Sequence, residues 1–473
     1  MNRCATLLLL LLLTVSCKVR IPENAVEGGP VSIFPDYADV TVPRIIAPLN
    51  FRIEQEADES VALFESGSGR LVASGPDILL KMSEWRGIIA DSDSVRVTIY
   101  TSRGGKWFRH DSFHFFISDD PIDGYLCYRR IFPGYGAYRA MGIYQRDLAS
   151  FEESLIFGHE DAGGARENAT CVNCHAFPSC DPSSMHLHIR GKRGGTLVGE
   201  KVFNMKNPTE GGPNPTYVNW SADGRFIAYS AQKVKQWFNS AAGNILEVAD
   251  ISSEILIYDV NANTIRRQPA IDSSRMVLMP VFSPSTDRIY YCAAMPEDSV
   301  SNVRYALYSI GFNPATGLCY GRSRCEVSTE RGSVSFPRIS YDGKYLIYSL
   351  AESGYFHAWH KESDLYILDL ETGESRALDE INSPEAESCH SWSLSGRWIA
   401  FGSRRFDGLY TRPFIAHIDE DGNCSKPFAV PQRNPEHYLT GMFSFNLPEF
   451  VSGRVEIKKK RIFRSLENPL QVN

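Results

Sequence analysis

The chain is predicted to be all-β, with a six-bladed β-propeller (alternatively seven-bladed) preceded by a small β-sandwich domain. Two observations support this prediction. Four segments in the second half repeat one hairpin pattern, and residues 18–117 contain alternating apolar strands without that repeat. The 473 residues are 43% hydrophobic and 22% charged, which provides enough apolar material for a core and for two domains.

The repeat is the strongest pattern in the chain. Each copy begins with an aromatic or aliphatic residue and a serine, passes through a tight turn that is often Asp-Gly, and ends in an apolar strand. A second pair of strands follows each copy, and four strands per unit are typical of a propeller blade. The four copies align without gaps and begin at Trp220, Phe282, Ile339 and Trp392.

Weaker copies upstream complete the predicted ring, which spans residues 118–455. Asp123-Gly124 resembles the turn of one copy, and Asp181–Ser184 followed by Met185–Ile189 resembles another. A strand within residues 442–450 is expected to return to the first blade and close the ring without a long free edge. Residues 456–473 are interpreted as a C-terminal tail. The expected blades are 118–160, 161–212, 213–272, 273–330, 331–382 and 383–432.

The first part of the chain is predicted to hold a signal and a separate small domain. Residues 1–17 contain Arg3, an apolar run too short to span a bilayer, and Thr14-Val15-Ser16-Cys17, which resembles a bacterial lipobox. Cys17 is therefore the predicted lipidation site, with an ordinary cleaved signal or a short anchor as alternatives. Residues 18–117 are predicted to form a β-sandwich behind a tether, or else an extension of the propeller.

These features predict an exported lipoprotein anchored in a membrane and facing the periplasm, with the outer membrane as the expected location. The formal net charge of -7 argues against nucleic acid as a partner. The basic run Lys458–Arg461 is interpreted as a solvated face of the tail. The expected partners are the membrane, through the lipid anchor, and a redox or envelope protein that the sequence does not identify.

Cys171-Val172-Asn173-Cys174-His175 is the motif that indicates a cofactor. Cys-x-x-Cys-His is the pattern at which exported proteins attach haem, the two thiols binding the porphyrin and the histidine binding the iron. We therefore predict one covalent haem c, held by Cys171, Cys174 and His175. Because the motif precedes a predicted strand of the second blade, we expect it in a loop at one mouth of the central channel.

The second axial ligand of this haem is not defined by the sequence. His390 stands two residues before Trp392, at the position in the last blade that corresponds to the motif, and is the first candidate. Met185 and His188 are other candidates, Met279 is a weaker one, and a five-coordinate iron is a further possibility. Two axial ligands would favour electron transfer, whereas an open position would favour gas binding or peroxide chemistry.

Other interpretations of the cysteines remain open. Cys171 and Cys174 could form a disulfide or stay free, or they could bind zinc together with Cys180 or His186. Elsewhere in the chain, Cys319 and Cys325 are the most plausible local disulfide, whereas Cys127 and Cys292 lie within apolar strands and are expected to be buried free thiols.

The repeats resemble those of a known family. The pattern Trp-Ser-x-Asp-Gly-(Arg/Lys)-x-Ile-x-(Tyr/Phe) is similar to that of TolB-like six-bladed propellers. The run Cys389–Phe401, with Tyr410-Thr411-Arg412 and the single Cys-x-x-Cys-His, resembles lipoproteins of Bacteroidota in which a TolB-like propeller carries this motif. The resemblance covers about residues 45–450. It implies the fold and haem binding, and it implies no defined reaction.

Three functions follow from these patterns. The first is electron transfer or redox sensing in the periplasm by one covalent haem. The second is a propeller scaffold for protein–protein interaction in the cell envelope, and the third is an envelope enzyme acting on saccharide. Because the sequence contains no nucleophile elbow, no His-Glu-x-x-His and no phosphate loop, an enzyme is the less favoured interpretation.

Overall fold

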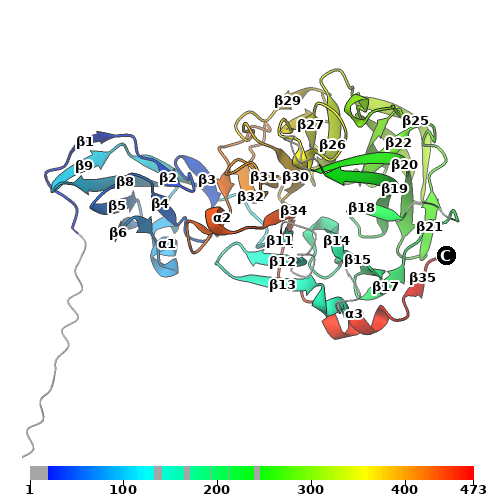
Figure 1. Ribbon diagram of the computed structural model, residues 1–473, viewed down its shortest axis with the longest axis horizontal. Helices are drawn as coiled ribbons and strands as arrows, with labels where there is room; N and C mark the ends of the chain where they lie inside the picture. The colour runs from blue at the N-terminus through cyan, green and yellow to red at the C-terminus, as the bar shows by residue number, and fades with distance from the viewer. Residues whose placement is uncertain are drawn as a thin grey trace, which may run out of the picture.

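The computed structural model describes residues 20–132, 141–163, 171–191, 193–210, 212, 214–238 and 246–473. Within them the chain forms an N-terminal β domain and a ring of β-sheets (Figure 1). The predicted signal peptide and its Cys17 lie outside the described residues. None of the helices in the described part is long and apolar enough to cross a membrane.

Six sheets of the described part stand around a central channel as the blades of a propeller, so the six-bladed prediction is confirmed over the seven-bladed alternative. Neighbouring strands within each four-stranded blade are antiparallel, and the innermost strand faces the channel. The strands, innermost first, are β34 (Ser444–Val451), β11 (Tyr125–Ile131), β12 (Gly142–Asp147) and β13 (Glu153–Gly158) in blade 1; β14 (Cys171–Ala176), β15 (His186–Arg190), β16 (Gly195–Val198) and β17 (Lys201–Asn204) in blade 2; β18 (Pro215–Trp220), β19 (Phe226–Phe238), β20 (Leu246–Asp259) and β21 (Thr264–Arg267) in blade 3; β22 (Met276–Phe282), β23 (Arg288–Ala294), β24 (Ala306–Asn313) and β25 (Leu318–Val327) in blade 4; β26 (Ser333–Ile339), β27 (Tyr345–Ala351), β28 (Asp364–Asp369) and β29 (Ser375–Ala377) in blade 5; and β30 (Glu387–Trp392), β31 (Trp398–Ser403), β32 (Arg412–His417) and β33 (Phe428–Ala429) in blade 6.

The ring is closed by β34, which covers most of the segment 442–450 that was expected to return to the first blade and extends one residue beyond it. It pairs antiparallel with β11, in a register that sets Val451 opposite Tyr125. Blade 1 therefore takes its innermost strand from near the C-terminus and its other three strands from residues 125–158. The pairing covers the edge of β11 that would otherwise stay open beside the channel.

The serine of each repeat explains why the four copies turn in the same way. Its hydroxyl oxygen accepts a hydrogen bond from the backbone N–H five residues later, where the second strand begins, at 2.9–3.1 Å. The fifth residue of each copy has a left-handed backbone, which favours glycine. The serines are Ser221, Ser283, Ser340 and Ser393, and the left-handed residues are Gly224, Thr286, Gly343 and Gly396.

A β-bulge interrupts the pairing of the innermost strand in every described blade. At each bulge one non-glycine residue has a left-handed backbone, with φ between 37° and 54°, a conformation that costs about 1 kcal/mol or more per residue. A bulge also resets the alternation of side chains along a strand. The left-handed residues of blades 1 to 6 are Leu447, Cys174, Tyr217, Met279, Phe336 and Cys389.

The N-terminal domain consists of two sheets and a helix, as expected for a small β-sandwich. Both sheets and the helix contribute to one core, in which the ring of Trp85 lies 6.1 Å from that of Phe115. The same core continues into blade 6, where the indole N–H of Trp398 donates to the carbonyl of Asp120 at 3.2 Å. The elements are β1 (Val26–Gly29), β3 (Val40–Pro43), β5 (Glu59–Ser66), β6 (Gly69–Ser74), β8 (Ser94–Arg103), β9 (Lys106–His110) and β10 (Phe113–Ser118) in the seven-stranded sheet, β2 (Ile33–Phe34), β4 (Phe51–Ile53) and β7 (Asp77–Ile78) in the three-stranded sheet, and α1 (Met82–Ile89).

The segment after the ring-closing strand folds against the outside of blades 1 and 2. Helix α3 (Lys459–Ser465) buries Ile462, and β35 (Leu470–Gln471) pairs parallel with β17. Lys458 and Arg461 of the basic run both form ion pairs with Glu200, at 3.1 and 2.8 Å. A further short helix, α2 (His437–Thr440), lies between blade 6 and β34.

The expected disulfide between Cys319 and Cys325 is wrong. Both thiols are free, and both residues lie on β25, with Cys319 opposite Phe312 and Cys325 opposite Tyr308. Four residues along the partner strand correspond to about 13 Å, far beyond the roughly 7 Å between Cα atoms that a disulfide permits. Cys127 and Cys292 are buried free thiols, as expected.

Candidate functional site

The Cys-x-x-Cys-His motif forms the innermost strand of blade 2, which corrects the expected position in a loop. Cys171–Ala176 are β14, and the strand predicted after the turn, β15, is the second strand of the blade. The channel-facing strand of each repeat therefore precedes the serine turn and does not follow it. The motif is thus part of the channel wall.

The bulge at Cys174 lies within the motif. The left-handed backbone of Cys174, with φ of 51°, shifts the register between Asn173 and Ala176. Cys171 and Cys174 both line the channel, whereas Val172 between them is buried in the core of the blade. The sulfur of Cys171 lies toward blade 1, and Cys174 packs partly against the core shared with blade 3.

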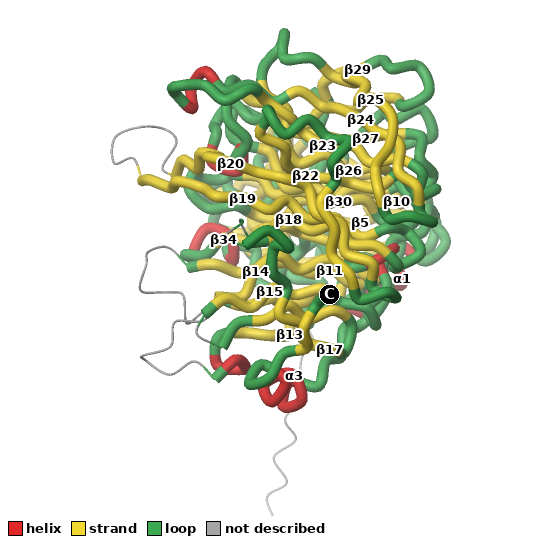
Figure 2. The backbone as a smooth tube through the Cα atoms, turned by 90° about the vertical axis from the view of Figure 1, so that its right-hand side faces the viewer, coloured by secondary structure: helices red, strands yellow, loops and turns green. Residues whose placement is uncertain are grey.

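The wide end of the channel is a cavity of about 980 Å³, large compared with the 300–1,000 Å³ of typical ligand pockets. All six left-handed residues of the inner strands contribute to its wall, so it lies on the axis of the ring. The hairpin β19–β20 projects beyond the blades beside it (Figure 2). Cys171, Cys174, His175, His188, Met279 and His390 all line this cavity.

His175 is a buried imidazole, 4% exposed, whose ring nitrogens make no close hydrogen bond. Burial, together with the positive charge of Arg129, lowers the pKa of His175 to about 4, so the ring is neutral at neutral pH. Backbone groups of Cys127 and Leu447 in blade 1 lie near enough to the ring to oppose this shift. A neutral imidazole is the form that binds a metal ion.

His390 occupies the equivalent position in blade 6, because it follows the left-handed Cys389 as His175 follows Cys174. The imidazole is turned toward blade 5, where Nε2 donates to the carbonyl oxygen of Ile347 at 2.9 Å, while Nδ1 is unpartnered. Burial lowers the pKa of His390 to about 3. His390 and His175 therefore occupy equivalent positions in their blades. However, Nε2 of His390 already donates a hydrogen bond within the protein.

The other candidate ligands differ in where they lie. His188 is opposite Asn173 on the neighbouring strand and lines the cavity, with Nδ1 2.9 Å from the hydroxyl oxygen of Thr196. Met279 also lines the cavity, whereas Met185 is 1% exposed and packs in the core of blades 1 and 2. Met141, which the sequence reasoning did not single out, has its sulfur 3.7 Å from the thiol of Cys171.

The charged residues of the cavity wall are mostly basic, although the chain as a whole is acidic. Arg129, Arg190, Lys206 and Arg338 line it, together with one carboxyl group, that of Glu449. Burial raises the pKa of Glu449 to about 7, against the opposing effects of Arg338 and of the backbone N–H of Phe177. Sequence reasoning missed these residues, although Arg338 and Glu449 each stand directly before the first residue of a repeat or of its equivalent.

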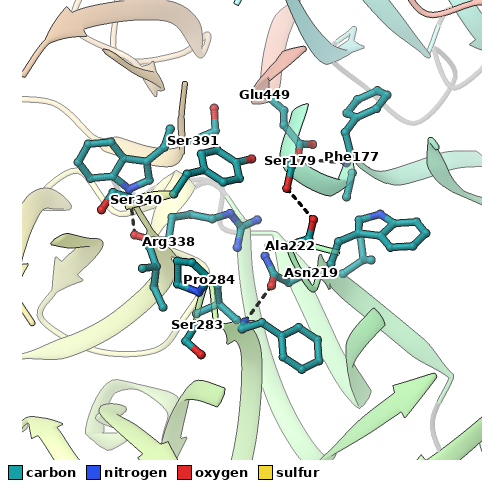
Figure 3. A pocket seen from close by; sticks show the side chains of 18 residues that line it. Phe177, Ser179, Asn219, Ala222, Ser283, Pro284, Arg338, Ser340, Ser391 and Glu449 are labelled. Carbon is teal, nitrogen blue, oxygen red and sulfur yellow. Dashed lines mark hydrogen bonds between the residues drawn. The ribbon is translucent and has the colours of Figure 1, made fainter. Parts of the chain in front are cut away.

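The narrow end of the channel holds a small pocket of about 70 Å³, in which Arg338 and Glu449 extend toward the middle (Figure 3). The turn Pro178–Cys180, which follows the motif in blade 2, covers this end. Ser179 donates to the carbonyl of Ala222 in blade 3 at 2.8 Å, and the thiol of Cys180 lies 3.4 Å from the hydroxyl of Tyr341 in blade 5. Both cavities therefore share one throat, lined by Arg338 and Glu449.

The residues proposed as zinc ligands do not come together around the motif. Cys180 lies at the narrow end of the channel, and Nδ1 of His186 bonds to the backbone carbonyl of Cys174 at 2.7 Å. In the described ranges no three His, Cys, Asp or Glu side chains are grouped in a way that would hold a metal ion. Cys171 and Cys174 are both free thiols.

The class of protein follows from the chain's own sheets: it is a six-bladed β-propeller preceded by a small β domain. No protein-family profile matches it, and neither does any curated protein. Among solved structures it is similar to a putative TolB from Agrobacterium tumefaciens, with 12% identity, 65% of this chain and 88% of that chain covered, and a TM-score of 0.36. It is similar also to an oligogalacturonate lyase in complex with manganese (13%, 64% and 78%, TM-score 0.35) and to a Synechocystis apocarotenoid oxygenase mutant (12%, 86% and 94%, TM-score 0.38).

Proposed function

We propose that this propeller binds one covalent haem c in its wide cavity and serves electron transfer or redox sensing as a periplasmic lipoprotein anchored through Cys17. The observation that supports the proposal is the convergence of three groups on the cavity wall. Cys171 and Cys174 are both free and line the cavity, and the neutral, buried imidazole of His175 lies beside them.

The two thiols would hold the porphyrin. Each S–H adds across one vinyl group, so that sulfur bonds to the carbon next to the ring and hydrogen goes to the terminal carbon, without any oxidant. The amide of Asn173 already donates to the sulfur of Cys171 at 2.8 Å. That hydrogen bond fixes the orientation of the first sulfur on the cavity wall.

His175 would provide the proximal ligand to iron. Because its pKa is lowered to about 4, the imidazole needs no deprotonation before it binds a metal ion at neutral pH. When bound, haem supplies one-electron exchange between ferric and ferrous iron, with a potential set by its axial ligands and by nearby charges. The surrounding strands exclude water from the histidine, which is 4% exposed.

Haem staining of a denaturing gel tests the proposal directly. The full chain, exported in a host with the haem-attachment machinery, should give a band with peroxidase activity, and Cys171→Ser with Cys174→Ser should abolish it. Cys325→Ser is the matched control, because this thiol is exposed on the outer strand of blade 4. An unstained, colourless wild-type protein of normal fold would contradict haem attachment.

The alternative functions are a protein-binding scaffold in the cell envelope and an envelope enzyme acting on saccharide. Neither requires two free cysteines and a histidine on the wall of the cavity. Both would be favoured by a wild-type protein that folds, carries no haem and keeps Cys171 and Cys174 as free thiols.

A further inference from the structure

Two arginines of the cavity wall have no acidic partner. In the described part of the chain, neither Arg129 nor Arg338 forms an ion pair, and Nε of Arg129 is buried without a hydrogen-bond partner. Among the described residues, the Arg338 side chain donates one hydrogen bond, to the carbonyl of Pro337 at 3.2 Å. Both side chains are partly exposed to a cavity whose charged residues are mostly basic, so they are available to an anionic ligand.

The two arginines approach the same region of the cavity from different blades. Arg129 is on β11 of blade 1, and Arg338 is on β26 of blade 5. Both guanidinium groups act on the thiol of Cys389 in blade 6, whose pKa burial raises and the two positive charges lower. Arg129 stands on the blade between blades 6 and 2, and its charge also lowers the pKa of His175, so it reaches the motif as well as Cys389.

Of the two arginines, Arg338 faces the motif across the channel. In a ring of six blades, blade 5 stands opposite blade 2, which carries Cys171 and Cys174, whereas blade 1 with Arg129 lies beside blade 2. Protoporphyrin has its two vinyl groups on adjacent pyrrole rings and its two propionates on the other two rings. A porphyrin attached to blade 2 by its vinyl edge therefore presents its carboxylates toward the opposite wall.

We propose that Arg129 and Arg338 bind the propionate carboxylates of the tetrapyrrole. The proposal rests on the proposed function and adds the groups that orient the cofactor in the cavity. Arginine suits this role because its planar guanidinium can donate two parallel hydrogen bonds to a carboxylate. Arg190, on the strand next to the motif, stands opposite Cys171 and is at the thiol side of the cavity.

Glu449 is the one carboxyl group of the cavity wall that opposes this arrangement. It shares the throat with Arg338, but the two side chains are not within ion-pair distance of each other. Burial raises the pKa of Glu449 to about 7, and the positive charge of Arg338 opposes this shift, so the two groups interact across the throat. Because they make no direct ion pair among the described residues, the guanidinium of Arg338 can still donate to an external carboxylate.

Binding of an iron-free porphyrin tests the proposal without iron ligation or covalent attachment. The full chain, produced without the attachment machinery, is titrated with protoporphyrin IX and with its dimethyl ester, and binding is followed by porphyrin fluorescence. We expect the ester to bind about tenfold or more weakly than the free acid, because a hydrogen-bonded charge pair contributes about 1.5–3 kcal/mol. Arg129→Gln and Arg338→Gln should each weaken the free acid and leave the ester unchanged.

The control variant is Arg322→Gln, which removes the same charge from the exposed outer strand of blade 4 and should bind both porphyrins like the wild type. Equal affinity of the wild type for acid and ester would overturn the proposal, even if an arginine variant does not fold. In haem-loaded protein, Arg338→Gln should retain the stained band and lower the midpoint potential, because a positive charge near the iron is lost.

These outcomes separate the two proposals. An unstained wild type that still prefers the free acid over the ester in an arginine-dependent manner would contradict covalent attachment and support carboxylate binding. A stained protein whose Arg129→Gln and Arg338→Gln variants keep the wild-type potential and porphyrin affinity would support haem attachment and contradict the role of the arginines.

Discussion

Glu449 combines burial in the channel throat with a pKa raised to about 7 from the ordinary 4.5. The folded chain thus holds this proton more tightly than the unfolded chain does. Below about pH 4.5 the group costs no stability, and the cost develops fully as pH rises through about 7. We expect Glu449→Gln to raise the free energy of unfolding by about 2 kcal/mol at pH 8 and to have little effect at pH 4.5. Urea unfolding at both pH values measures this difference, and an equal effect at both would contradict it.

His390 is predicted to stabilise the ring without binding iron. Its Nε2 donates to Ile347 in the neighbouring blade, and ligation through that nitrogen would break a buried hydrogen bond. His390→Ala should lower the free energy of unfolding by about 2 kcal/mol, because it leaves a buried carbonyl unpaired and removes packing. The spectrum of reduced, haem-loaded protein should not change. A loss of low-spin character in this variant would instead identify His390 as the second axial ligand.

For single residues, the sequence shows which residue types are present but not where their side chains lie in the fold. Cys171, Cys174 and His175 could be found from spacing alone, because Cys-x-x-Cys-His is a local pattern. Arg129 and Arg338 could not, since their convergence depends on ring closure between residues more than 200 positions apart. The wrong pairing of Cys319 with Cys325 has a related cause: nearness in sequence is not nearness in space on an extended strand.

Among the elements, the long hairpin β19–β20 is held to blade 5 by a buried ion pair. Nε2 of His360, next to the short turn His357–Trp359, lies 3.1 Å from the carboxylate of Glu247 on β20, and the two side chains are 3% and 9% exposed. Burial lowers the pKa of His360, but hydrogen bonds to Glu247 and Glu362 outweigh that effect and raise it to about 9. The hairpin thus forms a fixed part of the cavity wall.

Breaking this ion pair should loosen the hairpin. We expect Glu247→Gln to cost about 2 kcal/mol, because His360 loses one of its two carboxylate partners and keeps only Glu362, and to speed amide hydrogen exchange along β20. Because the pKa of His360 is raised from 6.5 to about 9, the stabilisation is complete below pH 6.5 and lost as pH rises through about 9. Wild type and variant should therefore converge in stability at pH 10. A difference that persists unchanged at pH 10 would contradict the ion pair as its source.

The repeat predicted the hairpins of four blades because their turn chemistry is local. Each serine bonds to a backbone N–H only five residues later, so the pattern is visible in a short window. The bulges of the inner strands have no recognisable sequence pattern, because their left-handed residues are Cys, Tyr, Met, Phe and Leu rather than glycine. For that reason the motif was expected in a loop, whereas it is part of a strand.

For the whole molecule, stability should depend on closure of the ring. A chain that ends before β34 lacks the innermost strand of blade 1 and exposes the edge of β11, so we expect it not to fold cooperatively. A chain that ends after Val455 lacks only α3 and β35, which cover the outside of blades 1 and 2, and should fold with modestly reduced stability. Thermal unfolding followed by circular dichroism compares the two. Cooperative unfolding of the shorter chain would contradict the role of closure.

The equivalence of blades 2 and 6 has a consequence for engineering the cofactor stoichiometry. Blade 6 already carries a cysteine and a histidine, Cys389 and His390, at the bulge where blade 2 has Cys174 and His175. Three residues before Cys389, at the position of Cys171, stands Ala386. The single exchange Ala386→Cys would therefore create a second Cys-x-x-Cys-His sequence in blade 6, two blades away from the first. If the proposed function is right, this variant should attach a second haem.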